Sequence, residues 1–200
     1  STQAKTLFPY TTLFRSRSMN LIHTMGQYYL AAFLAENDGK EFIRAAINSY
    51  EFANGAKLTE HSYVGNNFVS AIEYLLSKLG MFYKTRLVWA GDYADPEPNS
   101  DNLHIIAQGK QFMPSLPTTY NEMMKEYSFI VNHTKKQYVT KKGHVYHPLP
   151  LLTAEGNGRG GGDYRGPGED MIGIWARDVI SIQMEPPEGY TELKCEFSCD

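Results

Sequence analysis

Short apolar segments separated by turn-forming residues constrain the fold of this chain more than any other feature. Residues 27–35 (QYYLAAFLA) and 41–47 (EFIRAAI) flank the turn residues 37–39 (NDG), and residues 127–139 (YSFIVNHTKKQYV) hold two apolar arms around the polar stretch 132–136. An Asn or Asp followed by Gly between two strand-length segments is typical of a tight β-hairpin. We therefore predict two antiparallel hairpins, the second with a charged tip.

One helix is clearly indicated after the first hairpin. Apolar side chains recur every three or four residues at Phe68, Ile72, Leu75, Leu76 and Leu79, which is the spacing of one helical face. Asn66 or Asn67 can cap the start of this helix, and Gly80 can end it. We expect the apolar face to pack on the sheet.

The remaining segments complete a strand-rich pattern. Residues 86–90 and 171–184 favour strands, the second range holding one or two of them, and residues 190–197 favour a last edge strand. Residues 95–101 (DPEPNSD) read as a polar loop, and a short helix is expected on each side of the prolines within 103–125. The sum is an α+β domain: a mainly antiparallel sheet with one clear helix packed on it and one or two minor helices.

The first 18 residues are set apart from this domain. Residues 6–16 read TLFPYTTLFRS and match, residue for residue, the translation of a common sequencing adapter. We therefore treat residues 1–18 as an artefact segment and exclude them from reasoning about the fold. The natural chain is expected to begin at Met19 or Met25, and residues 19–200 are expected to form a single domain.

Charge and composition exclude several classes of protein. The chain has 19 Lys and Arg against 22 Asp and Glu, and without Lys5, Arg15 and Arg17 the balance is 16 against 22, a net charge of about −6. Wrapping nucleic acid requires many basic residues, so we do not expect it. No apolar run approaches the roughly 20 residues that span a bilayer, and Cys195 and Cys199 alone build no disulfide framework. We expect a cytoplasmic protein without a membrane partner or a cofactor.

Residues 153–166 (TAEGNGRGGGDYRG), here called the glycine loop, form the most unusual stretch. Six of these fourteen residues are glycine. Because glycine loses more conformational entropy on folding than other residues, each costs roughly 0.5 to 1 kcal/mol of stability relative to alanine. If the loop is ordered, its N–H groups can form a concave nest for an anion, and its arginines add charge-assisted donors. The predicted ligand-binding residues are Gly156, Gly158, Arg159, Gly160, Gly161, Gly162, Asp163, Tyr164 and Arg165. The alternative is a permissive surface loop without a ligand.

Established phosphate and metal motifs do not account for this loop. The glycines from Gly156 have the spacing of a dinucleotide fingerprint, but no clean central strand precedes them and no helix is indicated after them. The sequence contains no Gly-Lys-Ser/Thr phosphate loop and no Gly-x-Ser-x-Gly nucleophile elbow. Zinc could draw on His144, His147, Cys195 and Cys199, but their spacing is looser than that of structural zinc sites. No metal site is predicted.

Four carboxylates stand where loops could carry function. Asp92, Asp95, Asp163 and Asp178 each follow a strand-like segment or lie in a loop beside an aromatic residue. The candidates for catalysis are Asp163, Asp92 and Asp178, with His133 or His147 as the partner in acid and base catalysis. The alternative is ordinary turn chemistry, and the polar hairpin tip around His133 can equally be solvated.

These features lead to a prediction about where the site lies. We expect the glycine loop, the turns at Asp92 and Asp178, and the hairpin tip at residues 132–136 to converge on one face. Tyr93 or Tyr164 could then offer an aromatic face for stacking against a ligand.

Six segments resemble one family of proteins. They are MGQYY at Met25, KLTEHSYVGNNFV at Lys57, VWAGDYAD at Val88, YSFIVNHTKKQYV at Tyr127, HPLPLLTAEGNGRGGGDYRG at His147 and WARDVISI at Trp175. Together they look like a family of short accessory proteins of phages and their bacterial hosts, to which no activity is assigned. The resemblance covers nearly the whole chain from Met25 and implies a cytoplasmic viral accessory protein. Such proteins often block host defence, and one way of doing so is to sequester a nucleotide signal.

Three functions remain open from the sequence. The first is a binding protein for a small anionic, nucleotide-like ligand, with the loop N–H groups, Arg159 and Arg165 holding a phosphate. The second is a hydrolase acting on such a ligand through Asp and His. The third is a protein-interaction module that binds a host protein and whose loop becomes ordered on contact with it.

Overall fold

The computed structural model describes residues 26–157 and 161–198. The strands are β1 (Tyr29–Asn37), β2 (Lys40–Asn48), β3 (Thr85–Gly91), β4 (Phe129–Asn132), β5 (Gln137–Thr140), β6 (Ala154–Glu155), β7 (Val179–Gln183) and β8 (Thr191–Glu192). The α-helices are α1 (Leu58–His61), α2 (Asn67–Leu76), α3 (Leu103–Gln108), α4 (Tyr120–Met124) and α5 (Pro148–Leu152). Two 3-10 helices are η2 (Ser49–Phe52) and η3 (Glu169–Met171).

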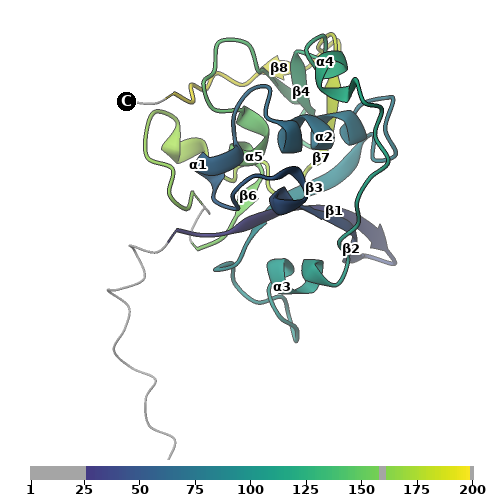
Figure 1. The fold of residues 1–200 in the computed structure, drawn as a ribbon, viewed down its shortest axis with the longest axis vertical. Helices are drawn as coiled ribbons and strands as arrows, with labels where there is room; N and C mark the ends of the chain where they lie inside the picture. Colours follow the sequence, from purple (N-terminus) through teal and green to yellow (C-terminus); the bar gives the residue numbers. More distant parts are fainter. Residues whose placement is uncertain (1–25, 158–160, 199–200) are drawn as a thin grey trace, which may run out of the picture.

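All of these strands belong to one sheet, in the order β2-β1-β3-β7-β4-β5-β8, with β6 beside β3. The pairs are antiparallel except for β3 with β6 and β5 with β8. Helices α1, α2 and α5 lie on one side of the β1–β3 part of the sheet and α3 lies on the other (Figure 1). The predicted α+β class, with a mainly antiparallel sheet and one main helix, is confirmed.

The central strands are buried on both faces, and this explains their continuous apolar sequence. Along β1, Tyr29, Ala31 and Phe33 join the larger core on the α2 side, whereas Leu30, Ala32 and Leu34 join a smaller core beneath α3. The same alternation in β3 sends Leu87 and Trp89 to the larger core and Val88 and Ala90 to the smaller one. Successive side chains of a strand point to opposite faces, so one short segment serves two cores.

Both predicted hairpins are present. β1 pairs with β2 across Asp38 and Gly39, whose φ angles of 52° and 74° suit the tight turn that an Asp-Gly pair forms. β4 pairs with β5, with Asn132 opposite Gln137. Here the side chain of Asn132 accepts a hydrogen bond from the backbone N–H of Lys135 at 2.9 Å, which stabilises the turn at the tip.

The main helix begins where the sequence predicts and ends earlier. The Asn66 side chain caps α2 by accepting hydrogen bonds from the N–H groups of Phe68 and Val69. The helix ends at Leu76 because Ser77 turns to an extended backbone, and its hydroxyl donates to the Tyr74 carbonyl at 2.8 Å. The expected continuation to Leu79 and Gly80 is therefore wrong, and Leu79 is an exposed side chain.

The C-terminal third differs most from the expectation. Residues 148–152 form α5, which the sequence did not indicate, and Ile172 and Ile174 lie in turns after η3 rather than in a strand. Only β7 forms within residues 171–184, and the last edge strand is reduced to the two residues of β8. These short elements are held by tertiary hydrogen bonds, such as those of the Gly173 and Trp175 N–H groups to carbonyls of α5.

A charged group is buried beneath α2. Glu73 is almost fully buried, and its Oε1 accepts hydrogen bonds from the Lys141 ammonium at 2.7 Å and from His147 Nε2 at 3.0 Å. Lys141 also donates to the Met124 carbonyl at 2.6 Å. The Leu149 N–H donates to His147 Nδ1, so the ring proton sits on Nε2. Burial alone would raise the pKa of Glu73, but the contacts with His147 and Lys141 outweigh burial and lower it.

We expect Lys141→Ala to lower the free energy of unfolding by about 3 kcal/mol, because removing one partner leaves the other charge buried and uncompensated. The adjacent Lys142 is exposed, so Lys142→Ala should change the free energy by less than about 0.5 kcal/mol. Urea denaturation of the two variants and the parent makes the comparison. Equal midpoints for the two variants would contradict the role given to Lys141.

The same carboxylate predicts a dependence on pH. A lowered folded-state pKa means that Glu73 stabilises the fold at any pH above its ordinary value of 4.5, and that this contribution is lost as the pH falls through the folded-state pKa. The stability difference between the parent and Glu73→Gln should therefore be constant from about pH 6 to 8 and shrink below about pH 4. A difference that grows on acidification would show that the carboxylate is protonated in the fold.

Candidate functional site

The described part of the glycine loop lies against the start of β1. Gly162 has a φ of 60°, and a Cβ atom at this position would lie 3.1 Å from the Tyr29 hydroxyl oxygen. Glycine alone combines this backbone conformation with such a close approach at no steric cost. The predicted ligand residues Gly158, Arg159 and Gly160 lie outside the described residues. Gly162, in contrast, lies against Tyr29, and Asp163 and Arg165 are close enough for their charges to act on its hydroxyl.

Two carboxylates act on the Tyr29 hydroxyl. Burial raises the pKa of Tyr29 well above its usual value, and the negative charges of Asp163 and Asp92 raise it further, against a smaller opposing effect of Arg165. The hydroxyl therefore stays protonated across the physiological range and is a hydrogen-bond donor held close to two acids. We call Tyr29, Thr59, Asp92, Asp163 and Arg165 the Tyr29 cluster.

Backbone and side-chain donors hold each carboxylate of the cluster. The Thr59 hydroxyl donates to Asp163 Oδ2, and the Thr59 N–H lies 3.4 Å from Oδ1, so α1 fixes the orientation of Asp163. The Tyr28 N–H donates to Asp92 Oδ1 at 3.0 Å. Asp92 follows the last residue of β3, and the pairing of Tyr29 with Gly91 brings it to the start of β1. The two acids thus come from distant parts of the chain.

A second glycine, Gly91, lies against the Tyr29 ring and the backbone of Glu155. A Cβ atom on Gly91 would lie 2.9 Å from the Glu155 carbonyl oxygen and 2.9 Å from the Tyr29 ring, which is closer than real Cβ contacts allow. Nearby, the Asn157 N–H donates to Gln27 Oε1 at 2.9 Å. The start of β1 and the first half of the glycine loop are therefore joined at the point where β3 ends.

A buried histidine that the sequence did not single out supports α1 from behind. The Trp89 indole N–H donates to His61 Nε2 at 2.9 Å, so the proton of this imidazole sits on Nδ1, which donates to the Gly55 carbonyl at 3.0 Å. Burial is the main reason that the pKa of His61 falls to about 4. With both ring nitrogens bonded and the ring neutral, His61 positions α1. A lone histidine within KLTEHSY gives no signal of this pairing.

Tyr164 and Arg165 of the glycine loop differ in exposure: the first is buried and the second is largely exposed. Tyr164 is fully buried in the larger core and donates to the Pro167 carbonyl at 2.5 Å, so it does not offer the expected stacking face. The Arg165 guanidinium is largely exposed, donating to the Gly162 and Tyr164 carbonyls and lying 3.8 Å from Glu169. Tyr93, the other stacking candidate, is partly exposed in the turn after β3.

The other two catalytic candidates lie at the opposite end of β3, so the expected convergence on one face is wrong. The Leu87 N–H donates to the Asp178 carbonyl at 3.1 Å, near the start of the strand that Asp92 follows. Leu87 and Asp92 are five residues apart, and an extended chain of that length spans roughly 17 Å. Asp178 accepts from Asn132 at 2.8 Å and pairs with Lys135 at 3.0 Å. It therefore stabilises the β4–β5 tip.

His133, the residue after β4, belongs to a separate hydrogen-bonded group with Ser181 on β7 and Tyr190 before β8. Its Nε2 lies 2.8 Å from the Ser181 hydroxyl and its Nδ1 lies 3.0 Å from the Tyr190 hydroxyl. Burial, with the nearby charge of Lys84, lowers the pKa of His133. Ser181 is fully buried and also accepts from Gln183. This Ser-His pair has no exposed hydroxyl for a substrate, and it lies away from Asp92 and Asp163.

The described residues carry no group of three or more His, Cys, Asp or Glu side chains that could hold a metal ion. Of the zinc candidates, His147 is bound to Glu73, and the His144 Nδ1 accepts from the Phe197 N–H at 3.1 Å. Cys195 is a partly buried thiol whose pKa is raised to about 11, mainly by burial. Cys199 lies outside the described residues.

Comparisons with known proteins add no activity to this geometry. No protein-family model matches the chain, and no curated protein or solved structure is significantly similar to it. Across the part of the chain that the structure describes, no helix is both long and apolar enough to cross a membrane.

We expect Gly162→Ala to lower the free energy of unfolding by about 2 kcal/mol, because a left-handed backbone and a close contact with Tyr29 both oppose a Cβ atom. Gly39 is the matched control, since its φ is 74° and nothing lies within 4 Å of its Cβ position. Gly39→Ala should therefore cost only the backbone strain of about 1 kcal/mol. Equal losses in urea denaturation would mean that the glycine loop does not pack on Tyr29.

Proposed function

We propose that the protein binds a small anionic, nucleotide-like ligand at the Tyr29 cluster. The observation that carries this proposal is the pair of carboxylates, Asp92 and Asp163, held beside one protonated tyrosine hydroxyl at the edge of the glycine loop. If the two acids had only a structural role, we would expect a cation bonded between them. Here the neighbouring cation, Arg165, donates to loop carbonyls and leaves its guanidinium largely exposed.

The chemistry of a nucleotide matches this arrangement. Carboxylates accept hydrogen bonds from ribose hydroxyls in many nucleotide sites, a role open to Asp92 and Asp163. Phosphate oxygens would accept from the N–H groups of the glycine loop and from Arg165. A phosphate would give Arg165 hydrogen bonds to an anionic acceptor, in place of its present bonds to neutral carbonyls. The partly exposed ring of Tyr93, next to Asp92, is available to a base.

The hydrolase alternative receives less support. It needs a histidine close to the acids, but His133, which follows β4, is bonded to Ser181 and Tyr190. His61, which follows Thr59 on α1, has both nitrogens bonded and a pKa of about 4. Binding without turnover is therefore the function we favour. The cytoplasmic location and the role as a viral accessory protein, sequestering a nucleotide signal, are proposed with it from the sequence resemblance.

The proposal predicts thermal stabilisation by nucleotides. A ligand at 100 times its dissociation constant adds about 2.7 kcal/mol to the unfolding free energy, which raises the midpoint temperature of a domain of this size by about 5 to 10 °C. We expect at least one member of a panel of mononucleotides, dinucleotides and cyclic nucleotides to produce such a shift. Asp92→Asn and Arg165→Ala should each reduce the shift by half or more.

Asp101→Asn, which changes an exposed acid in the loop before α3, is the matched control and should respond like the parent. A panel that leaves every midpoint unchanged would reject nucleotide binding and favour the protein-interaction module. That module would then be supported by a stable pull-down of one host protein that Arg165→Ala does not affect. Recovery of the intact nucleotide after heat release supports binding. Recovery of a cleaved product would instead establish the hydrolase.

A further inference from the structure

A cleft separate from the Tyr29 cluster opens between the β1–β2 hairpin and the segment that leads into α3. Its volume is about 640 Å³, which is within the range of small-molecule sites. Its apolar lining includes Leu34 and Ile43 from the hairpin and Leu103 and Ile106 from α3. The exposed ring of Phe42 also borders it. This lining suits the apolar body of a ligand.

Two lysines supply the cationic groups of the cleft. Lys40 begins β2 and Lys110 follows α3, and both line the cleft. Among the described residues, neither ammonium group has a hydrogen-bond or ion-pair partner. Most other charged groups of this region are paired, so these two are the donors available to an incoming anion.

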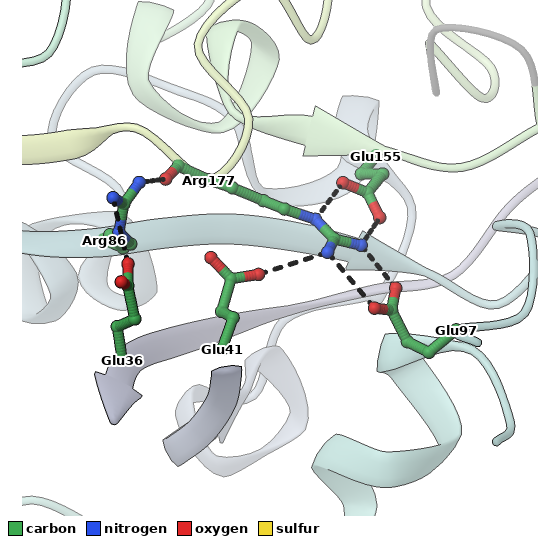
Figure 2. A network of polar contacts seen from close by, with 6 residues as sticks. All are labelled: Glu36, Glu41, Arg86, Glu97, Glu155 and Arg177. Carbon is green, nitrogen blue, oxygen red and sulfur yellow. Dashed lines mark hydrogen bonds and ion pairs between the residues drawn. The ribbon is translucent and has the colours of Figure 1, made fainter. Parts of the chain in front are cut away.

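The two acids of the cleft are already engaged by one arginine (Figure 2). Arg177 donates to Glu97 through both terminal nitrogens, at 2.5 and 3.3 Å, and to Glu41 at 3.1 Å. It also makes a two-point contact with Glu155 at 2.7 and 2.5 Å. Hydrogen bonds with Glu155 and Glu97 raise the pKa of Arg177 against the opposing effect of burial. The guanidinium therefore remains charged, and the carboxylates of Glu41 and Glu97 are already bonded to it.

The backbone holds this arginine rigidly in place. The Arg177 N–H donates to the Leu87 carbonyl at 2.8 Å, and its carbonyl accepts from Arg86 at 3.1 Å. Its φ of 65° is a conformation that a non-glycine residue adopts only where its surroundings enforce it. The two acids that line the cleft, Glu41 and Glu97, are therefore bonded to a fixed arginine in the absence of a ligand.

We propose that this cleft binds a small amphipathic anion, with an apolar body against Leu34, Ile43 and Ile106 and one anionic head group between Lys40 and Lys110. The pairing of free lysines with an apolar floor selects this ligand class. A cationic ligand would meet two ammonium groups and acids already bonded to Arg177. The site is independent of the Tyr29 cluster.

Anilinonaphthalene sulfonate, a fluorescent amphipathic anion, is the probe for this site. We expect saturable binding that decanoate displaces and uncharged decanol displaces at least tenfold less well. Lys40→Ala with Lys110→Ala should weaken binding about tenfold, because each exposed ion pair contributes up to about fivefold. Lys142→Ala, an exposed lysine elsewhere, should leave the dissociation constant unchanged. Equal affinities of the double variant and the parent would overturn the proposal.

Adjacent residues of α3 test the apolar wall. Ile106 lines the cleft and Ile105 is exposed outside it. Ile106→Ala should weaken the probe about fivefold through lost apolar contact, whereas Ile105→Ala should not. Amide shifts in NMR spectra on adding the probe should centre on Ile43, Leu103 and Lys110. Shifts centred instead on the hollow lined by Lys78 and Met184 would reject this site.

A last comparison separates the two proposals. Asp92→Asn, which is directed at the Tyr29 cluster, should leave probe binding unchanged. Probe binding lost in this variant would place the probe at the Tyr29 cluster and overturn the separate cleft. Cooperative urea unfolding of each variant establishes that fluorescence changes do not come from a partly unfolded chain.

Discussion

The antiparallel register of β1 on β3 is the constraint on which the rest of the structure depends. It places Tyr29 opposite Gly91, and both strands are buried on two faces, so a shift of one residue would exchange the contents of the two cores. Because the register is held this strongly, the start of β1 and the end of β3 meet at one place. The Tyr29 cluster forms there, and the missing side chain of Gly91 leaves room for the Glu155 backbone and the Tyr29 ring.

Charged groups reinforce this sheet at two points where apolar packing alone would not specify the arrangement. Beneath α2, Glu73 ties the helix to Lys141 after β5 and to His147 before α5. On the other side, Arg177 ties Glu155 beside β3 to Glu41 on β2 and to Glu97 in the loop before α3. In each case one ion joins elements far apart in the chain. Glu73 is buried and Arg177 is partly buried. A buried ion is costly unless its partners are in place, so Glu73 in particular favours one arrangement of the segments around it.

The hairpins, α2 and the α+β class could be predicted because their signals are local. Asp38-Gly39 suits its turn, and Asn66 caps the helix with its own side chain. The glycine loop was singled out for a similar reason, since a cluster of glycines indicates unusual backbone conformations. Sequence reasoning failed where contacts at long range decide the backbone. Residues 171–174 alternate like a strand but bend to pair with α5 and to bring Arg177 against Leu87.

For the candidate site, the sequence by itself determined which residue types were available: acids after strands, a glycine loop and its arginine. Only the tertiary structure decided which of them meet. Asp92 and Asp163 reach Tyr29, while Asp178 and His133 lie at the other end of β3 and Tyr164 turns into the core. The order of strands in the sheet, β3 between β1 and β7, sets this outcome. The strand order depends on side chains from distant segments packing together in both cores, and no single segment of the chain contains that information.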